Sequence, residues 1–227
     1  MKINLGNALA QGAMFLLTYA VPLFIPGGIR AWPAAWIFLV IWFGFNHGIL
    51  AWLYLHNPDL LQERLQVDTK NRPGWDKILT FLLYSSIFLW LLFMAFDVVR
   101  FHWSPVNTYL QVGGTALLVC SCYLLFIVFR ENTYLSMAVR IQVERGQTVI
   151  STGPYQLVRH PMYAAMIFFF VGTPLLLGSW LGVPLGILVM LILAWRAVLE
   201  ESELRRELPG YARYMDQVKY RLIPHVW

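Results

Sequence analysis

The chain has 227 residues, of which 59% are hydrophobic and only 13% are charged, and its mean hydropathy is +0.58. These values argue against a soluble globular domain, because the apolar residues form runs of about 20 rather than short amphipathic stripes. The net charge of +5 fits loops that face anionic lipid head groups and requires no nucleic-acid partner.

Six apolar runs predict an all-α integral membrane protein with about six transmembrane helices, folded as a single domain over residues 1–227. The runs are approximately 8–26, 32–55, 78–99, 109–129, 162–178 and 180–199. The first run is too long and too poor in N-terminal charge for a cleaved signal peptide, so we expect a retained helix. Only "GSW" separates the last two runs, which predicts a tight helical hairpin, and Pro174 and Pro184 within it predict kinks.

The distribution of Lys and Arg predicts the orientation in the membrane. With six spans, one side receives both termini and the two longer connections, and these segments hold 15 of the 17 basic residues. The other side holds only Arg30 and Arg100. Both termini are therefore predicted to be cytoplasmic.

Nearly all hydrophilic sequence falls on that predicted cytoplasmic side, in residues 56–77, residues 131–161 and the tail after Arg196. In the first of these segments, Asn57–Pro58 predicts the cap and start of a short surface helix. Leu60, Leu61 and Leu65 share one face of this helix, which favours a position along the membrane interface. Together the three segments predict a roof of loops and C-terminal tail over a site at the membrane surface.

The stretch "GPYQLVRHPMY" predicts an anion site at the start of the fifth apolar run. Gly153–Pro154 marks a turn, and Pro161 suits the first position of a helix. His160 then lies just outside a helix N-terminus, where backbone N–H groups and the helix dipole favour an anion. Arg159 adds a planar guanidinium that grips a carboxylate or phosphate. The alternative is that Arg159 only reaches to lipid phosphates and His160 only caps the helix.

A second group of charges ends the sixth run. Arg196 and Glu200 are four residues apart and share a helix face, and Glu201 follows directly. An ordinary interfacial salt bridge is one interpretation. The other is a pocket with Arg159 and His160 that would complement a zwitterionic or cationic small molecule.

Other polar or small residues carry less information. Gly113–Gly114 lacks the G-x-G-x-x-G pattern after a strand, so no Rossmann domain is predicted and close helix packing explains the pair better. Asn46 and His47 lie inside the second run and either line a polar cavity or serve packing. Cys120 and Cys122 show no disulfide pattern and are read as packing residues. No set of residues has metal-ligand spacing.

Taken in order, "TGPYQLVRHPMY", a short hairpin, "WRAVLEESEL" and "VKYRLIPHVW" resemble the isoprenylcysteine carboxyl methyltransferase family. The chain looks like a prokaryotic-type member, related in turn to membrane phospholipid methyltransferases. The earlier "NPDLLQERL" and "RENTY" also look like this group. The resemblance covers roughly residues 57–227, a family-like catalytic core, and leaves residues 1–56 as an N-terminal helix pair.

The resemblance implies methyl transfer from S-adenosylmethionine, which is bound without a Rossmann domain under the cytoplasmic roof. It also implies roles for individual residues. Arg159, Arg196, Glu200 and Glu201 would be catalytic, and Tyr155, His160, Pro161, Tyr163 and Glu200 would bind the cofactor. One departure from the family is "LPGY", residues 208–211, where many relatives are more aromatic or acidic; it affects the shape of the roof and so the choice of substrate.

The implied acceptor is a lipophilic molecule that enters from the bilayer, above all the carboxylate of an isoprenylcysteine-like substrate. Such a carboxylate is already ionised at neutral pH, whereas the amine of a phospholipid would need a base such as Glu200 or Glu201. Two other function classes stay open. One is an NADPH-dependent membrane reductase of the sterol type, and the other is a non-enzymatic membrane scaffold.

Overall fold

A computed structural model of the chain describes residues 5–28, 32–65, 72–136 and 138–227. The described residues contain helices and connecting segments but no β-strand, which confirms the all-α prediction. The α-helices are α1 (Leu5–Phe24), α2 (Pro33–His56), α3 (Pro58–Leu65), α4 (Gly74–Ala95), α5 (Thr108–Glu131), α6 (Pro161–Leu177), α7 (Gly182–Glu207) and α8 (Tyr211–Gln217). A π-helical segment, η1 (Phe96–Phe101), extends α4, and η2 (Val143–Arg145) and η3 (Gly153–Gln156) are short 3-10 helices.

Each predicted apolar run coincides with one helix or with a helix and its extension. Within the described residues, four helical stretches are long and apolar enough to cross a membrane, and two apolar helices are shorter. The four are Pro33–His56, Gly74–Phe101, Thr108–Glu131 and Gly182–Glu207, and the shorter two are Gly12–Phe24 and Pro161–Leu177. The architecture is therefore that of an all-α integral membrane protein, while the number of passes stays a prediction.

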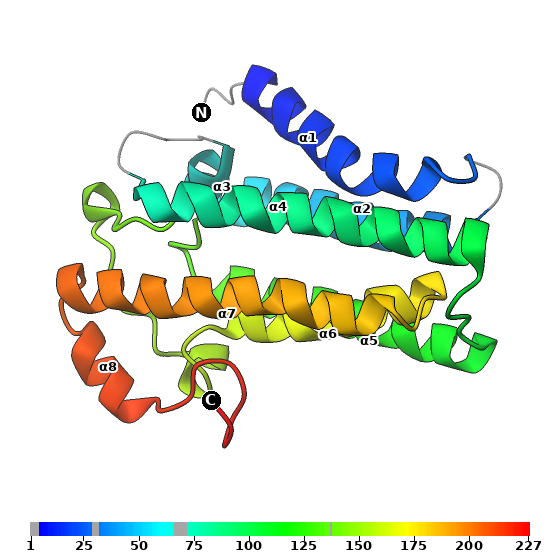
Figure 1. Cartoon of the computed structure of the whole chain (residues 1–227). Coiled ribbons are helices and arrows are strands. Elements are labelled where there is room, and N and C mark those ends of the chain that lie inside the picture. The colour runs from blue at the N-terminus through cyan, green and yellow to red at the C-terminus, as the bar shows by residue number, and fades with distance from the viewer. Residues whose placement is uncertain (1–4, 29–31, 66–71, 137) are drawn as a thin grey trace.

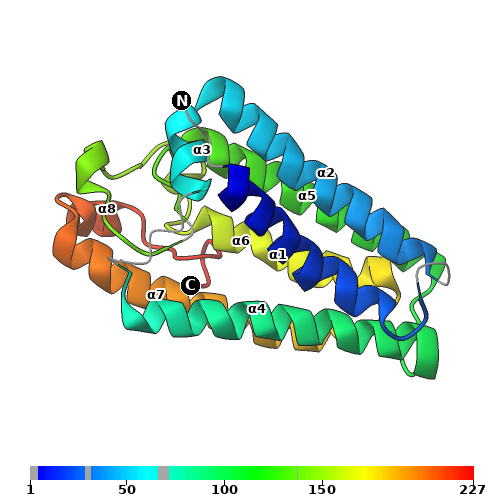
Figure 2. The ribbon, with the colours of Figure 1, turned by 90° about the horizontal axis from the view of Figure 1, so that it is seen from above.

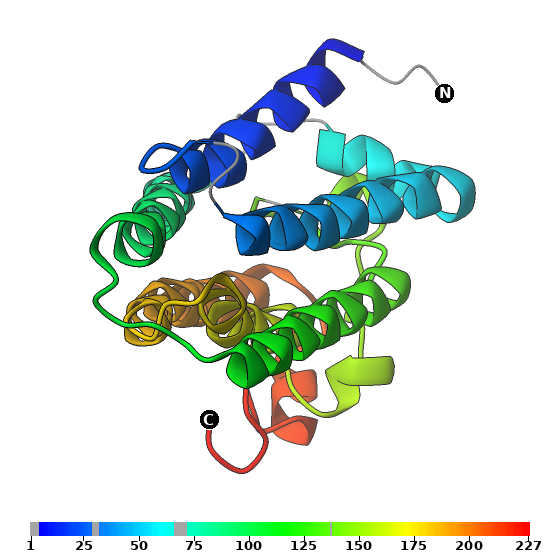
Figure 3. The ribbon, with the colours of Figure 1, turned by 90° about the vertical axis from the view of Figure 1, so that its right-hand side faces the viewer.

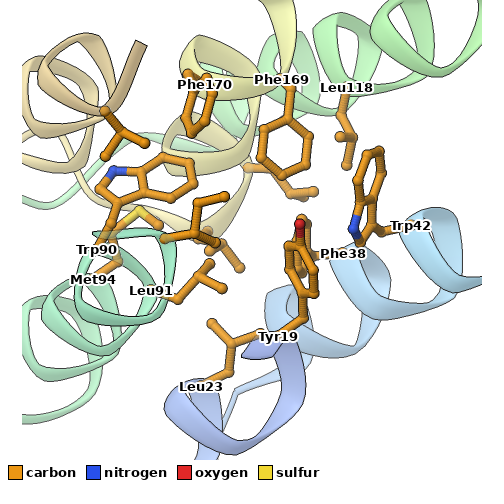
Figure 4. Close-up of a cluster of buried hydrophobic side chains, with 14 of the residues drawn as sticks. Tyr19, Leu23, Phe38, Trp42, Trp90, Leu91, Met94, Leu118, Phe169 and Phe170 are labelled. Atoms are coloured by element: carbon orange, nitrogen blue, oxygen red, sulfur yellow. The ribbon is translucent and has the colours of Figure 1, made fainter. Parts of the chain in front are cut away.

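The long helices lie side by side, and the hydrophilic elements gather at one end of the bundle (Figure 1). Figure 3 shows α1 and α2 on one side and α5, α6 and α7 on the other, with α4 along one edge. Seen from above, α4 runs beside α7 and α2 runs beside α5 (Figure 2). Aromatic rings fill the space between these groups of helices (Figure 4). The rings of Trp42 and Phe169 lie 4.6 Å apart between centroids, and those of Trp90 and Phe170 lie 5.2 Å apart.

Two glycines bring α5 and α6 into backbone contact. A Cβ atom added at Gly114 would lie 2.5 Å from the backbone nitrogen of Leu176, and one added at Gly172 would lie 2.7 Å from the carbonyl oxygen of Gly114. Because neither backbone has room for a side chain, the small residues set the distance between these helices. This confirms the packing interpretation of the glycine pair for Gly114, whereas Gly113 has open space around it.

The connection between α6 and α7 is the predicted tight hairpin. Gly178 ends α6 with a φ of 99°, a left-handed conformation that favours glycine. Pro184 falls in the first turn of α7, where a missing N–H breaks no intrahelical bond, so the expected kink has no cause there. The helix also continues to Glu207, eight residues beyond the predicted end at residue 199. The prediction followed the apolar run, whereas the charged last turns that come after the run are helical too.

The short helix α3 begins as predicted, since Asn57 Oδ1 accepts a hydrogen bond of 3.1 Å from the backbone N–H of Leu60. Its apolar face, however, does not lie on the membrane interface. Leu60, Leu61 and Leu65 are buried in a cluster with roof residues such as Leu135. The prediction was wrong because a leucine stripe covered by protein has the same sequence pattern as one covered by lipid.

A buried carboxylate stabilises the opposite end of the bundle. Asp97 in η1 accepts hydrogen bonds from the backbone N–H and hydroxyl of Ser104 and from the hydroxyl of Ser179, the last at 2.5 Å. These bonds tie η1 to the loop after it and to the hairpin between α6 and α7. The carboxylate is fully buried and is satisfied by neutral donors.

Candidate functional site

A cavity of about 570 Å³ lies at the hydrophilic end of the bundle. Its walls come from the first turns of α6, the last turns of α7, α8, η3 and residues 138–150, here called the roof segment. The cavity brings together the residues selected from the sequence, with one exception, Glu201. Those in its wall are Tyr155, Arg159, His160, Pro161, Tyr163, Arg196 and Glu200.

Arg196 organises the deep side of this cavity. Its Nε donates to Asp76 Oδ1 at 2.8 Å, and its Nη1 donates to the hydroxyl oxygen of Tyr163 at 3.2 Å. The Tyr163 hydroxyl in turn donates to Glu200 Oε2 at 2.9 Å. Arg196 and Glu200, predicted to share a helix face, thus belong to one hydrogen-bonded chain through Tyr163, and Glu200 presents a carboxylate to the cavity.

Asp76, in the first turn of α4, is fully buried beneath this chain of bonds. Besides Arg196, it pairs with Arg72 and accepts a hydrogen bond of 3.2 Å from the backbone N–H of Val139 in the roof segment. A buried carboxylate needs such partners, because an unpaired charge would be costly away from water.

Glu201 has a different environment from its neighbour Glu200. It is only 3% exposed and lies between three basic side chains. Arg159 Nε donates to Glu201 Oε1 at 2.6 Å and Arg221 Nε donates to Oε2 at 2.8 Å, while His160 Nε2 lies 3.3 Å from Oε1. This cluster joins the start of α6 to α7 and to the C-terminal tail.

Arg159 is therefore held by protein groups rather than by lipid head groups. In addition to Glu201, its Nη1 donates to the carbonyl oxygens of Val218 and Lys219 at 2.7 and 2.8 Å. Its backbone N–H donates to Tyr220. The alternative in which Arg159 only reaches to lipid phosphates does not describe this geometry, and neither does an anion grip by a free guanidinium.

His160 lies where the sequence predicted, at the N-cap of α6, and Pro161 occupies the first helical position. The imidazole makes no capping hydrogen bond with its side chain and instead lines the cavity, stacked on Tyr163 with 5.5 Å between ring centroids. The interpretation of His160 as a simple helix cap is thus not supported.

The roof side of the cavity is aromatic. Asn132 donates to the hydroxyl oxygen of Tyr155 at 2.7 Å, and the hydroxyl of Tyr214 donates to the carbonyl of Tyr155 at 2.7 Å. Burial raises the pKa values of both tyrosines above the usual range, so both phenols are neutral at physiological pH. Leu208 and Val149 add aliphatic surface to the same wall.

Sequence reasoning missed several residues of this site: Arg72, Asp76, Asn132, Tyr211 and Tyr214. Asn132 lies in "RENTY", a stretch that already resembled the family, and Asp76 is a lone acidic residue just before an apolar run. Both features gave a weak indication that these residues belong to the site. Asn46 and His47, by contrast, bond to carbonyls of their own helix, at Trp42 and Phe43.

The thiols of Cys120 and Cys122 are free. In the part of the chain that the structure describes, no group of three or more His, Cys, Asp or Glu side chains could hold a metal ion.

Comparison with known proteins adds to this geometry. A search of curated proteins finds no match. Residues 110–208 match a family model described as phospholipid methyltransferase. The matched stretch runs from α5 to the end of α7 and contains all the site residues selected from the sequence. This family lies in the same superfamily as the isoprenylcysteine methyltransferases. The match therefore supports a membrane methyltransferase, and most residues of the cavity wall at the hydrophilic end of the bundle lie inside the matched stretch.

Proposed function

We propose that this protein transfers a methyl group from S-adenosylmethionine to a lipid-soluble acceptor at the cytoplasmic surface of a membrane. The observation that carries the proposal is the cavity, because its wall holds all but one, Glu201, of the residues that the family resemblance assigned to the cofactor and to catalysis. The match of residues 110–208 to a methyltransferase family supports the same reaction class.

The residues present fit this methyl donor. A volume of about 570 Å³ lies within the usual range of small-molecule sites. Glu200 offers a carboxylate for an ammonium group, and Tyr155 and Tyr214 offer apolar faces with polar tips for a nucleoside. When bound, S-adenosylmethionine supplies a methyl group on a sulfonium that is already electrophilic.

The work left to the chain is positioning and exclusion of water. Glu200, oriented by the Tyr163 hydroxyl, holds a cationic group in the cavity. His160, fixed beside Tyr163, offers a ring nitrogen at the start of α6. Glu201 acts from outside the cavity: together with Arg159, which lines the wall, it fixes the C-terminal tail to the starts and ends of the helices that form the site.

The acceptor follows from the charges that face the cavity. An isoprenylcysteine-like carboxylate, the acceptor implied by the family resemblance, would need a free arginine, yet Arg159 and Arg196 are both bonded to carboxylates. A phospholipid amine would need a carboxylate to accept its proton, and the wall holds Glu203 and Glu207 besides Glu200, which is assigned to the ammonium group of the donor. We therefore propose the amine as the first acceptor to test and the carboxylate as the second.

A labelled-methyl transfer assay decides between them. Purified protein in vesicles is given labelled S-adenosylmethionine with either phosphatidylethanolamine or an isoprenylcysteine analogue, and the lipid-soluble product is identified. Label in the phospholipid head group supports the amine, and label released by mild base from the analogue supports the carboxyl ester. Transfer to neither acceptor by folded protein contradicts the proposal for both.

A further inference from the structure

Asp76 lies outside the residues that match the methyltransferase family, yet it contacts the centre of the candidate site. Its carboxylate accepts hydrogen bonds from three separate segments of the chain. They are Arg72 just before α4, Arg196 in α7 and the backbone N–H of Val139 in the roof segment. The side chain is fully buried, so these bonds are shielded from water and hold their partners firmly.

The bond to Arg196 fixes the direction of its guanidinium. With Nε held by Asp76 Oδ1 at 2.8 Å, the planar fork directs Nη1 toward the Tyr163 hydroxyl. That hydroxyl is then free to donate to Glu200. The orientation of the Glu200 carboxylate in the cavity thus depends on Asp76, through Arg196 and Tyr163.

The bond to Val139 acts on the other wall of the cavity. Val139, Arg140 and Ile141 line the cavity from the roof segment. The segment has a second anchor, because Arg140 pairs with Glu63 of α3 through two hydrogen bonds of 3.1 and 2.6 Å. Of these two anchor residues, Glu63 and Asp76, only Asp76 also accepts a hydrogen bond from Arg196.

We infer that Asp76 is a positioning residue that fastens the roof segment to Arg196, so that the closed roof and the oriented Tyr163–Glu200 pair form together. The part of this inference that concerns the methyl donor rests on the proposed function. The part that concerns the roof does not, because the Val139–Asp76 bond joins two groups of the protein itself.

The substitution Asp76→Asn tests the inference. An asparagine has one acceptor oxygen and one NH₂ group, so it must turn a donor toward Arg72, Arg196 or the N–H of Val139. We expect amide hydrogen exchange in residues 138–150 to accelerate about tenfold as the roof opens. We also expect the affinity for S-adenosylmethionine to fall about tenfold, in line with the loss of hydrogen bonds to a charged group.

Asp97→Asn is the matched control. Asp97 is as deeply buried as Asp76, but it lies in η1, at the opposite end of the bundle. Its partners include two serine hydroxyls, which can rotate to accept hydrogen bonds from the NH₂ group of an asparagine. This variant should leave exchange in the roof segment and affinity for the donor within about twofold of the wild type. Asp76→Glu keeps the charge but moves it by one methylene group, so its exchange in the roof segment should still be faster than in the wild type, though less so than in Asp76→Asn, and its loss of donor affinity should be smaller. This variant takes the place of Asp76→Asn if the latter does not fold.

The outcomes separate the two proposals. Unchanged exchange in residues 138–150 in the Asp76 variants overturns the role of Asp76, whatever the donor does. Faster exchange in both the Asp76 and Asp97 variants overturns it too, because the effect would then be general destabilisation. A wild-type protein that binds no S-adenosylmethionine contradicts the proposed function, while the exchange measurement still decides the role of Asp76.

Discussion

The adjacent residues Glu200 and Glu201 have identical side chains but different environments, and therefore different expected roles. Glu200 lines the cavity, whereas Glu201 is bonded to Arg159 and Arg221 and is 3% exposed. We expect Glu201→Gln to lower the free energy of unfolding by about 3 kcal/mol, because it leaves two guanidiniums without their carboxylate. Glu200→Gln should leave the thermal midpoint nearly unchanged but reduce methyl transfer. Thermal unfolding and turnover measured on both variants check this, and equal loss of stability in the two would contradict it.

The tyrosines of α8 provide a second contrast at this scale. The Tyr214 hydroxyl donates to the carbonyl of Tyr155, whereas the Tyr211 hydroxyl, although buried, has no hydrogen-bond partner among the described residues. Tyr214→Phe should therefore lower the unfolding free energy by about 1 kcal/mol, and Tyr211→Phe should leave it unchanged or raise it. Thermal melts of the two variants in the same detergent test this. A larger loss of stability in Tyr211→Phe than in Tyr214→Phe would contradict this prediction.

The sequence was informative about residues where local rules decide their position. Pro161 and His160 lie at a helix start because proline suits the first turn and disfavours helical geometry before it. Asp76 was missed because its partner Arg196 is 120 residues away. The different roles of Glu200 and Glu201 were also hidden, since they depend on where the tail residue Arg221 folds back.

At the scale of elements, the crossing of α5 and α6 gives a direct test of packing. Gly114→Ala would place its Cβ 2.5 Å from the backbone of Leu176, whereas an alanine at Gly113 meets nothing within 4 Å. We expect Gly114→Ala to cost several kcal/mol, since backbone rather than a flexible side chain must move. Gly113→Ala should be neutral or slightly stabilising because alanine favours the helix. Similar melting temperatures for the two variants would show that the helices do not meet there.

Hydrophobic runs predicted the existence and type of the long helices well, because spanning segments need about 20 apolar residues. Their ends were less predictable. The charged last turns of α7 stay helical beyond the apolar run, up to Glu207. The face of α3 was misassigned because Leu60, Leu61 and Leu65 are covered by the roof, a long-range contact that no local pattern encodes.

On the scale of the whole molecule, the hydrophilic elements lie at one end of the bundle (Figure 1). Residues of these elements line the candidate cavity. With 15 of the 17 Lys and Arg residues in segments assigned to one side, we predict that this end faces the cytoplasm. A reporter that is active only outside the cytoplasm should be silent when fused after Trp227. An active reporter there, or external labelling of residues 140–150, would reverse the orientation.

Binding of a methyl donor in the cavity at the hydrophilic end is tested most directly by calorimetry on folded, detergent-purified protein, with S-adenosylmethionine, its demethylated product and NADPH titrated separately. We predict saturable binding of the donor and of its product at one site per chain, weakened by His160→Ala and by Arg196→Lys, and no binding of NADPH. Binding of NADPH alone would favour the reductase, and binding of none of the three by folded protein would contradict the proposed donor site.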